Sequence, residues 1–266
     1  YSGKEIMKTV IGIPARLGSS RFPGKPLAKI CGLSMLEHVY KRCTFADNVD
    51  EIFIATCDQE IVIEADNFGA KSIMTDPEIQ RPGLRVAEAA KSLDLDDNDI
   101  VVVVQGDEPL IHPDMINLCL RPLIDENDLY VSNLVSIIDQ DDEWHDPNNV
   151  KVVTDLNMNA IYMSRSPIPS VDHEEIRGVR YLQIGFFAFR WHFFKTFNDL
   201  PSTPLGKAES VEMLQAIEHG YKVRMVLSNY KSIGVDTRKD LLAAEAIMKE
   251  DSVFLKYKKE NIIQDV

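Results

Sequence analysis

The run Ile100–Val104 (I-V-V-V-V) constrains the fold of this 266-residue chain more than any other segment. Five consecutive β-branched residues favour a strand, and an unbroken apolar run is typical of a strand that is covered on both faces, as in a parallel sheet. A second apolar run, Val10–Ile13, has the same character. Segments with apolar residues at helical spacing separate such strands along the chain. This alternation predicts an α/β fold with a doubly wound, mostly parallel sheet.

The remaining segments extend this alternation. Ser34 precedes the amphipathic segment Met35–Cys43, and Glu37 stands at its third position, which predicts a helix that begins with a capping box. Pro122 should close a helix over 115–120, because proline lacks the N–H that a continuing helix needs. We expect further helices over 58–67, 84–93, part of 205–218 and 237–249, and further strands over 51–56, 71–75, 150–154, 160–163, 184–189 and 222–226.

The domain organisation follows from a change of character after Ser136. Residues 139–146 are acidic and irregular, and 166–178 combine prolines with mixed charge. We expect one α/β domain over residues 1–266, in which 137–230 form an elaboration of the sheet that also supplies dimer contacts.

Charge and cysteine usage exclude several classes of protein. The net charge of −13 argues against a nucleic-acid surface. Residues 1–43 nevertheless carry +6, which suits a small polyanion because the basic field is local. The four cysteines lack C-x-x-C spacing, which argues against zinc and fits a reducing compartment. No membrane-length apolar run and no secretory signal are visible, so we expect a cytoplasmic protein without membrane contact.

The most distinctive polar segment is the loop that follows Val10–Ile13, within V-I-G-I-P-A-R-L-G-S-S-R-F-P-G-K-P. It carries Arg16, Arg21 and Lys25 among glycines and prolines. Loop N–H groups with Arg and Lys side chains can hold a polyphosphate, although a solvated basic loop would show the same composition. The spacing matches neither the P-loop nor G-x-G-x-x-G.

Two aspartates stand in short polar motifs, Asp107 at the end of a predicted strand and Asp236 after an apolar residue. Asp107 follows Ile100–Val104 in Q-G-D-E-P, and Asp236 lies in I-G-V-D-T before a helix. A carboxylate in such a place is costly to desolvate unless it is paired or binds a metal. The alternatives are that Asp107 caps a turn and that Asp236 is an ordinary helix N-cap.

The motif P-A-R-x-x-S-x-R-x-P-x-K-P resembles the nucleotide-binding loop of the sugar-acid cytidylyltransferases, and in particular the CMP-KDO synthetases (3-deoxy-manno-octulosonate cytidylyltransferases). The resemblance runs from about Lys8 to Met248. It implies a nucleotide-diphospho-sugar transferase-like fold and transfer of CMP from CTP to an acidic sugar with release of pyrophosphate. It also implies a homodimer.

The resemblance also assigns roles to individual residues. It implies nucleotide binding by Ala15, Arg16, Ser19, Lys25, Thr56, Arg85 and Gln105. It implies catalysis by Lys25, Arg16, Arg21 and Asp107, a Mg²⁺ ion held by Asp107 and Asp236, and acceptor binding by Arg165, Gln183 and Glu212. For Arg165 the alternative is a surface arginine. Glu209 and Glu212 are spaced three apart and should share one helix face, for which a solvated acidic face is the more common meaning.

Some positions depart from the family pattern. Arg81–Arg85 replaces S-G-T-[DE]-R, and Cys57 is inserted between A-T and Asp58. Gln183 replaces a histidine, which loses a titratable donor, and Met213 replaces a glutamine, which exchanges an amide for an apolar thioether. We therefore keep open an altered acceptor such as a phosphono acid, a related nucleotidyltransferase that uses UTP or GTP, and a non-catalytic nucleotide-binding protein.

Overall fold

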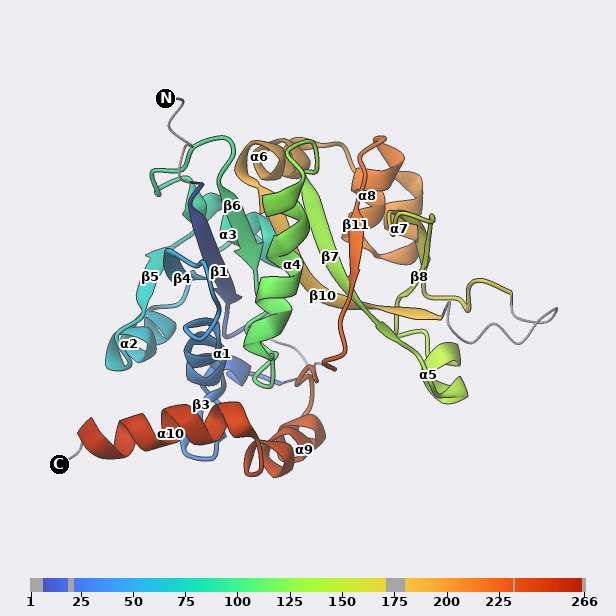
Figure 1. The fold of residues 1–266 in the computed structure, drawn as a ribbon. Helices are drawn as coiled ribbons and strands as arrows, with labels where there is room; N and C mark the ends of the chain where they lie inside the picture. The colour runs from blue at the N-terminus through green and yellow to red at the C-terminus, as the bar shows by residue number, and fades with distance from the viewer. Residues whose placement is uncertain (1–6, 19–21, 171–179, 232, 265–266) are drawn as a thin grey trace. The chain divides into compact units, whose positions relative to one another are not determined.

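A computed structural model of the chain describes residues 7–18, 22–170, 180–231 and 233–264 (Figure 1). The chain divides into two compact units. The first comprises Tyr1–Leu95, Val101–Asn117 and Ser232–Val266, and the second comprises Asp96–Ile100 and Leu118–Lys231. The second unit thus contains the predicted elaboration 137–230 and also takes in residues 118–136.

The first unit is built on the predicted parallel sheet. Its elements are β1 (Thr9–Ala15), the short 3-10 helix η1 (Lys25–Leu27), β2 (Lys29–Ile30), β3 (Leu33–Ser34), α1 (Met35–Cys43), β4 (Glu51–Thr56), α2 (Gln59–Asn67), β5 (Lys71–Met74), α3 (Pro82–Ala90), β6 (Ile100–Val103, apart from its first residue), α9 (Arg238–Met248) and α10 (Ser252–Gln264). The strand order is β6-β1-β4-β5, and β4 runs parallel to both β1 and β5. Every residue of β1 and β6 is buried, as their unbroken apolar character predicts.

The C-terminal helices complete the core of this unit. Met248 in α9 and Phe254 and Tyr257 in α10 join a buried cluster with Ile30 and Val235. The buried His38 of α1 adds a polar link, because its ring contacts the Tyr257 hydroxyl at 2.6 Å. The helix α10 has no counterpart among the elements expected from the sequence.

The second unit is a mixed sheet with short helices. Its elements are β7 (Val131–Ile137), α5 (Asp141–His145), β8 (Lys151–Thr154), β9 (Ala160–Ser164), β10 (Tyr181–Arg190), α6 (Trp191–Asp199), α7 (Pro204–Glu209), α8 (Glu212–Glu218) and β11 (Arg224–Leu227). The order is β11-β7-β10, in which β11 is parallel and β10 antiparallel to β7, while β8 pairs antiparallel with β10 and β9. The predicted strands 150–154, 160–163, 184–189 and 222–226 are confirmed, whereas β7 and α6 were not expected.

The expectation that Pro122 ends a helix is wrong. The helix α4 (Pro113–Asp125) continues through Pro122 into the second unit. Proline removes one helical hydrogen bond but its fixed φ is compatible with a helix. Packing outweighs that loss here, because Leu123 is completely buried and its carbonyl accepts a 2.6 Å hydrogen bond from Arg190 Nη2.

Over the described ranges, no helix is both long enough and apolar enough to cross a bilayer.

Candidate active site

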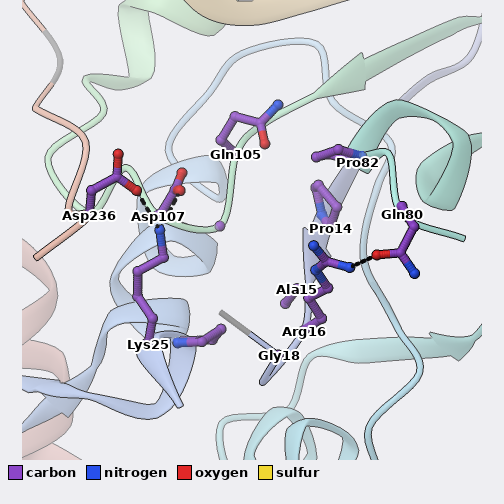
Figure 2. A pocket seen from close by; sticks show the side chains of 12 residues that line it. Pro14, Ala15, Arg16, Gly18, Lys25, Gln80, Pro82, Gln105, Asp107 and Asp236 are labelled. Atoms are coloured by element: carbon purple, nitrogen blue, oxygen red, sulfur yellow. Dashed lines mark hydrogen bonds and ion pairs between the residues drawn. The ribbon is translucent and has the colours of Figure 1, made fainter. Parts of the chain in front are cut away.

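A cavity of about 520 Å³ opens beside the carboxyl ends of β1 and β6, entirely within the first unit (Figure 2). Such strand ends are where open α/β sheets bind ligands. Its walls come from four segments: the end of β1 with η1 and the loop between them (16–24, called the phosphate loop after its predicted ligand), the residues around the start of α3, the segment after β6, and the loop before α9. The lining residues are Pro14, Ala15, Arg16, Gly18, Lys25, Pro26, Gln80, Pro82, Gln105, Gly106, Asp107 and Asp236.

The two predicted aspartates meet at one lysine. The ammonium Nζ of Lys25 lies 2.7 Å from Oδ2 of Asp107 and 3.1 Å from Oδ1 of Asp236. Only 12% of the Lys25 side chain is exposed, against 36% for Asp107 and 46% for Asp236. The carboxylates therefore present a cation-binding position at the cavity wall, and Figure 2 shows all three side chains converging there.

Backbone geometry explains this convergence. The N–H of Val235 donates to the carbonyl of Asp107 at 2.9 Å, which ties the segment after β6 to the segment before α9. A Cβ at Gly106 would lie 2.7 Å from the carbonyl oxygen of Pro14, so only glycine permits this close approach. Gly24 begins η1 with a φ of 69°, a left-handed conformation that suits glycine.

The ordinary explanation for Asp236 as a helix N-cap is wrong. The N-cap of α9 is Thr237, whose side chain accepts from Asp240 N while the Asp240 carboxylate accepts from the Thr237 backbone in a capping box. The Asp236 side chain is directed to Lys25 instead.

Arg16 lies on the opposite side of the cavity. Its Nη1 donates a 2.6 Å hydrogen bond to Oε1 of Gln80, in the loop that precedes α3. Gln80 and Pro82 line the cavity although we did not predict either as a site residue. Pro82 belongs to the segment Arg81–Arg85 that departs from the family pattern, and this departure was a signal that could have identified it; Gln80 directly precedes that segment.

The phosphate loop is also anchored by Asp58. The Leu17 N–H donates to Asp58 Oδ2 at 2.7 Å, and the Asp58 N–H donates to Oγ1 of Thr56. Asp58 stands at the N-cap of α2 but makes no side-chain cap bond there, because its carboxylate is used by the loop. Thr56 is fully buried and is not among the residues that line the cavity, and its hydroxyl accepts the bond that orients Asp58.

Arg85 likewise does not reach the cavity. Its side chain is buried in α3, where Nη1 donates to Thr75 Oγ1 and Nη2 to the Ile79 carbonyl. These bonds hold the loop that carries Gln80. The predicted site residues Ala15 and Gln105 do line the cavity, whereas Ser19 and Arg21 lie outside the described residues.

The predicted acceptor residues belong to the second unit. Arg165 is held by backbone carbonyls: Nε donates to Glu209 O at 2.7 Å and Nη1 to Pro147 O at 3.1 Å. The Glu209 carboxylate in turn accepts from Tyr162, Ser164 and the Arg165 N–H. Burial acts to raise the pKa of Glu209, but these hydrogen bonds outweigh it and the pKa is lowered.

Glu209 and Glu212 do not share a helix face, contrary to expectation. Glu209 ends α7 and Glu212 begins α8, because Ser210 between them adopts a left-handed φ of 52° that interrupts the helix. Gln183 in β10 donates through Nε2 to Asn133 Oδ1 at 2.9 Å. Met213 is 1% exposed and is a core residue.

The cavity residues fit a magnesium ion that is shared with a nucleotide. Mg²⁺ prefers octahedral oxygen sites with one or two carboxylates, completed by substrate phosphates and water. The Lys25 ammonium already shows that a cation fits between Asp107 and Asp236. In the described part of the chain, no group of three or more His, Cys, Asp or Glu side chains is placed to hold a metal ion.

Three comparisons place these features among known proteins. Residues 10–233 match the family described as Cytidylyltransferase. The 3-deoxy-manno-octulosonate cytidylyltransferase of Thermodesulfovibrio yellowstonii is 40% identical over 249 residues, which cover 90% of this chain and 97% of that protein. The 8-amino-3,8-dideoxy-manno-octulosonate cytidylyltransferase of Shewanella halifaxensis is 38% identical and covers 92% of this chain and 100% of its own.

Among solved structures, CMP:2-keto-3-deoxy-manno-octonic acid synthetase complexed with CTP matches with a TM-score of 0.85 at 36% identity. The match covers 91% of this chain and 99% of that chain. This likeness confirms the expected nucleotidyltransferase-like fold.

Proposed function

This chain belongs to the cytidylyltransferase family, in the group of the 3-deoxy-manno-octulosonate cytidylyltransferases. We propose that it transfers CMP from CTP to 3-deoxy-manno-octulosonate or a closely related sugar acid and releases pyrophosphate. The observation that carries the proposal is the convergence of Asp107 and Asp236 on Lys25 in a cavity that Arg16 also lines. Fixed cations and carboxylates at one cavity suit a metal–triphosphate substrate.

The cationic side chains divide the work of binding the phosphates. Arg16 offers a planar fork of donors, and Lys25 a compact charge on a flexible stem. In an in-line displacement, the acceptor hydroxyl attacks the α-phosphorus and the β- and γ-phosphates depart together. We infer that Arg16 and Lys25 bind the departing pyrophosphate and stabilise its developing charge. Arg21 has the same proposed role from the family resemblance.

We propose that Asp107 and Asp236 hold the magnesium ion. When bound, Mg²⁺ supplies neutralisation of negative charge on the triphosphate. The protein's own contribution is to fix both carboxylates through the Val235–Asp107 backbone bond. Gln105 and Ala15 line the same cavity and are proposed to contact the nucleotide.

We propose an octulosonate as the acceptor. The altered acceptor was suggested by Gln183 and Met213. Met213 is buried in the core, so it no longer supports that alternative. The Shewanella halifaxensis relative is named for the 8-amino sugar, so this sugar is the second candidate. Arg165, Gln183 and Glu212 stay the proposed acceptor residues.

The test is pyrophosphate release by the full chain with CTP and Mg²⁺, comparing 3-deoxy-manno-octulosonate, its 8-amino analogue and a phosphono acid. We expect the two octulosonates to exceed the phosphono acid by orders of magnitude. UTP and GTP in place of CTP test the other nucleotide assignments. Release with none of these acceptors would favour a non-catalytic nucleotide-binding protein.

Asp107→Asn provides the matched variant. It should lower turnover at least about a hundredfold, since an amide neither neutralises nor binds a cation as a carboxylate does. Asp114→Asn, at an exposed position in α4, is the control. Near-normal turnover of Asp107→Asn would remove its proposed metal role.

We also propose a cytoplasmic homodimer, and light scattering of the purified chain tests the oligomeric state.

A further inference from the structure

We propose that Lys25 is an internal counter-ion for Asp107 and Asp236, and that the nucleotide must draw it away before these carboxylates can take a divalent cation. This inference rests on the proposed function, because it concerns how the same site is loaded. It adds a role for Lys25 in the nucleotide-free protein, beyond binding of the phosphates.

The first step is that the ammonium and a metal ion would compete for the same oxygens. Lys25 Nζ lies 2.7 Å from Asp107 Oδ2 and 3.1 Å from Asp236 Oδ1. Mg²⁺ binds carboxylate oxygens at about 2.1 Å, so an ion bridging those two atoms would occupy the position of the ammonium. Two cations at that separation would also repel strongly, because the side chain of Lys25 is largely withdrawn from water.

The second step is that Lys25 can leave without disturbing the backbone. Its Cα is fixed by η1, whose start is set by Gly24 and whose second position is Pro26. The four-carbon stem above it is flexible, and the ammonium has three donors that rotate freely. Phosphate oxygens in the same cavity would give Lys25 an alternative partner of opposite charge.

The third step is that the other described cation of the cavity, Arg16, takes no part in this competition. Its guanidinium donates to Gln80 rather than to either aspartate, and Figure 2 shows it on the far wall. Arg16 therefore provides a control that has the same charge in the same cavity but lacks the contact.

These steps imply a coupling between the two ligands. Because Lys25 neutralises the carboxylate pair, the nucleotide-free protein should bind divalent metal weakly. A triphosphate that attracts Lys25 frees the carboxylates, and by linkage the metal must then strengthen nucleotide binding by the same factor.

The experiment measures binding of Mn²⁺ alone to the full chain without nucleotide, from the electron paramagnetic resonance signal of the free ion. Lys25→Met should bind Mn²⁺ at least about tenfold more tightly than wild type. The double variant Lys25→Met/Asp107→Asn should lose that gain, which assigns it to the carboxylates. Arg16→Met should change the affinity less than about threefold, because it removes charge without removing the competing contact.

Equal Mn²⁺ affinity in wild type and Lys25→Met would overturn the inference, as would an equal gain in Arg16→Met. If Lys25→Met fails to fold, Lys25→Gln replaces it with a neutral side chain that retains polarity. The two proposals fail separately. If CTP-dependent pyrophosphate release is absent but Lys25→Met binds Mn²⁺ more tightly as expected, only the enzyme function is refuted. If pyrophosphate is released but Lys25→Met binds Mn²⁺ no more tightly than wild type, only the counter-ion role is refuted.

Discussion

The N–H of Val235 donates a 2.9 Å hydrogen bond to the carbonyl of Asp107, and this bond sets the distance between the two proposed metal ligands. Val235 is itself completely buried, in the cluster that also contains Met248 of α9 and Phe254 of α10. The position of Asp236 therefore depends on the packing of α9 and α10 as well as on the sheet. Asp236, a proposed metal ligand, is thus positioned by helices that contribute no residue to the lining of the cavity.

The phosphate loop is held in a similar way by residues outside its own sequence. The described part of the loop is anchored at Leu17 by Asp58 and at Arg16 by Gln80. Loops need such restraints because ordering them costs conformational entropy. Two predictions follow from these anchors.

Asp58→Ala should weaken CTP binding with little effect on turnover. The variant leaves the Leu17 N–H without its acceptor, so the loop must be ordered by the ligand itself. We expect the KM for CTP to rise about tenfold, equivalent to about 1.4 kcal/mol. Asp58→Asn retains an oxygen acceptor and should show a smaller rise. Glu60→Ala, at an exposed position in α2, is the control, and equal KM values for Asp58→Ala and wild type would contradict the anchoring role.

Gln80→Leu should raise the KM for CTP by about three- to tenfold, because Arg16 keeps its charge but loses the partner that orients its fork. Steady-state kinetics with varied CTP measure this effect. Glu78→Gln in the same loop is the matched surface variant and should behave as wild type. An unchanged KM in Gln80→Leu would show that Arg16 is oriented without Gln80.

The fold could be predicted largely from the sequence because its signals are local. Unbroken apolar runs predicted the buried strands, and helical spacing after a Ser cap predicted α1. Two of the errors arise at single residues. Pro122 lies inside α4 because Leu123 is buried, and Ser210 divides a predicted helix by adopting a left-handed conformation.

The candidate site was predicted less evenly. Lys25, Asp107 and Asp236 could be identified because each lies in a short motif that resembles the family pattern. The roles of Asp58 and Gln80 could not be predicted, since each depends on one hydrogen bond to a residue at least 41 positions away. Arg85 matched a family motif, yet its guanidinium donates to hydroxyl and carbonyl groups of the segment before α3, which sequence spacing does not reveal.

Arg85→Met should therefore act mainly on stability. The substitution keeps much of the side-chain volume but leaves a buried acceptor at Thr75 and a half-buried one at Ile79 without this donor. We expect the free energy of unfolding to fall by about 2–4 kcal/mol, measured by urea denaturation. In the folded protein the KM for CTP should rise no more than in Gln80→Leu, because Arg85 acts through the loop that carries Gln80. A large KM increase at wild-type stability would restore Arg85 as a direct nucleotide ligand.

His38 should make stability depend on pH below neutrality. Its Nε2 donates to the Ile30 carbonyl at 2.7 Å and its Nδ1 accepts from Tyr257. Burial lowers the pKa of His38 from 6.5 to about 4, although the bond to Ile30 opposes this shift. The unfolded chain therefore binds the proton more readily, and this contribution to stability, complete above about pH 6.5, is lost as the pH falls towards 4.

The expected loss attributable to His38 is about 2 kcal/mol between pH 7.5 and pH 5. His38→Gln keeps a donor for Ile30 but cannot titrate, so its unfolding free energy should decline less over this interval than that of wild type. Urea denaturation at both pH values measures the difference, and His219→Gln at an exposed position should retain the wild-type dependence. If the gap between wild type and His38→Gln is the same at both pH values, His38 is not the titrating group.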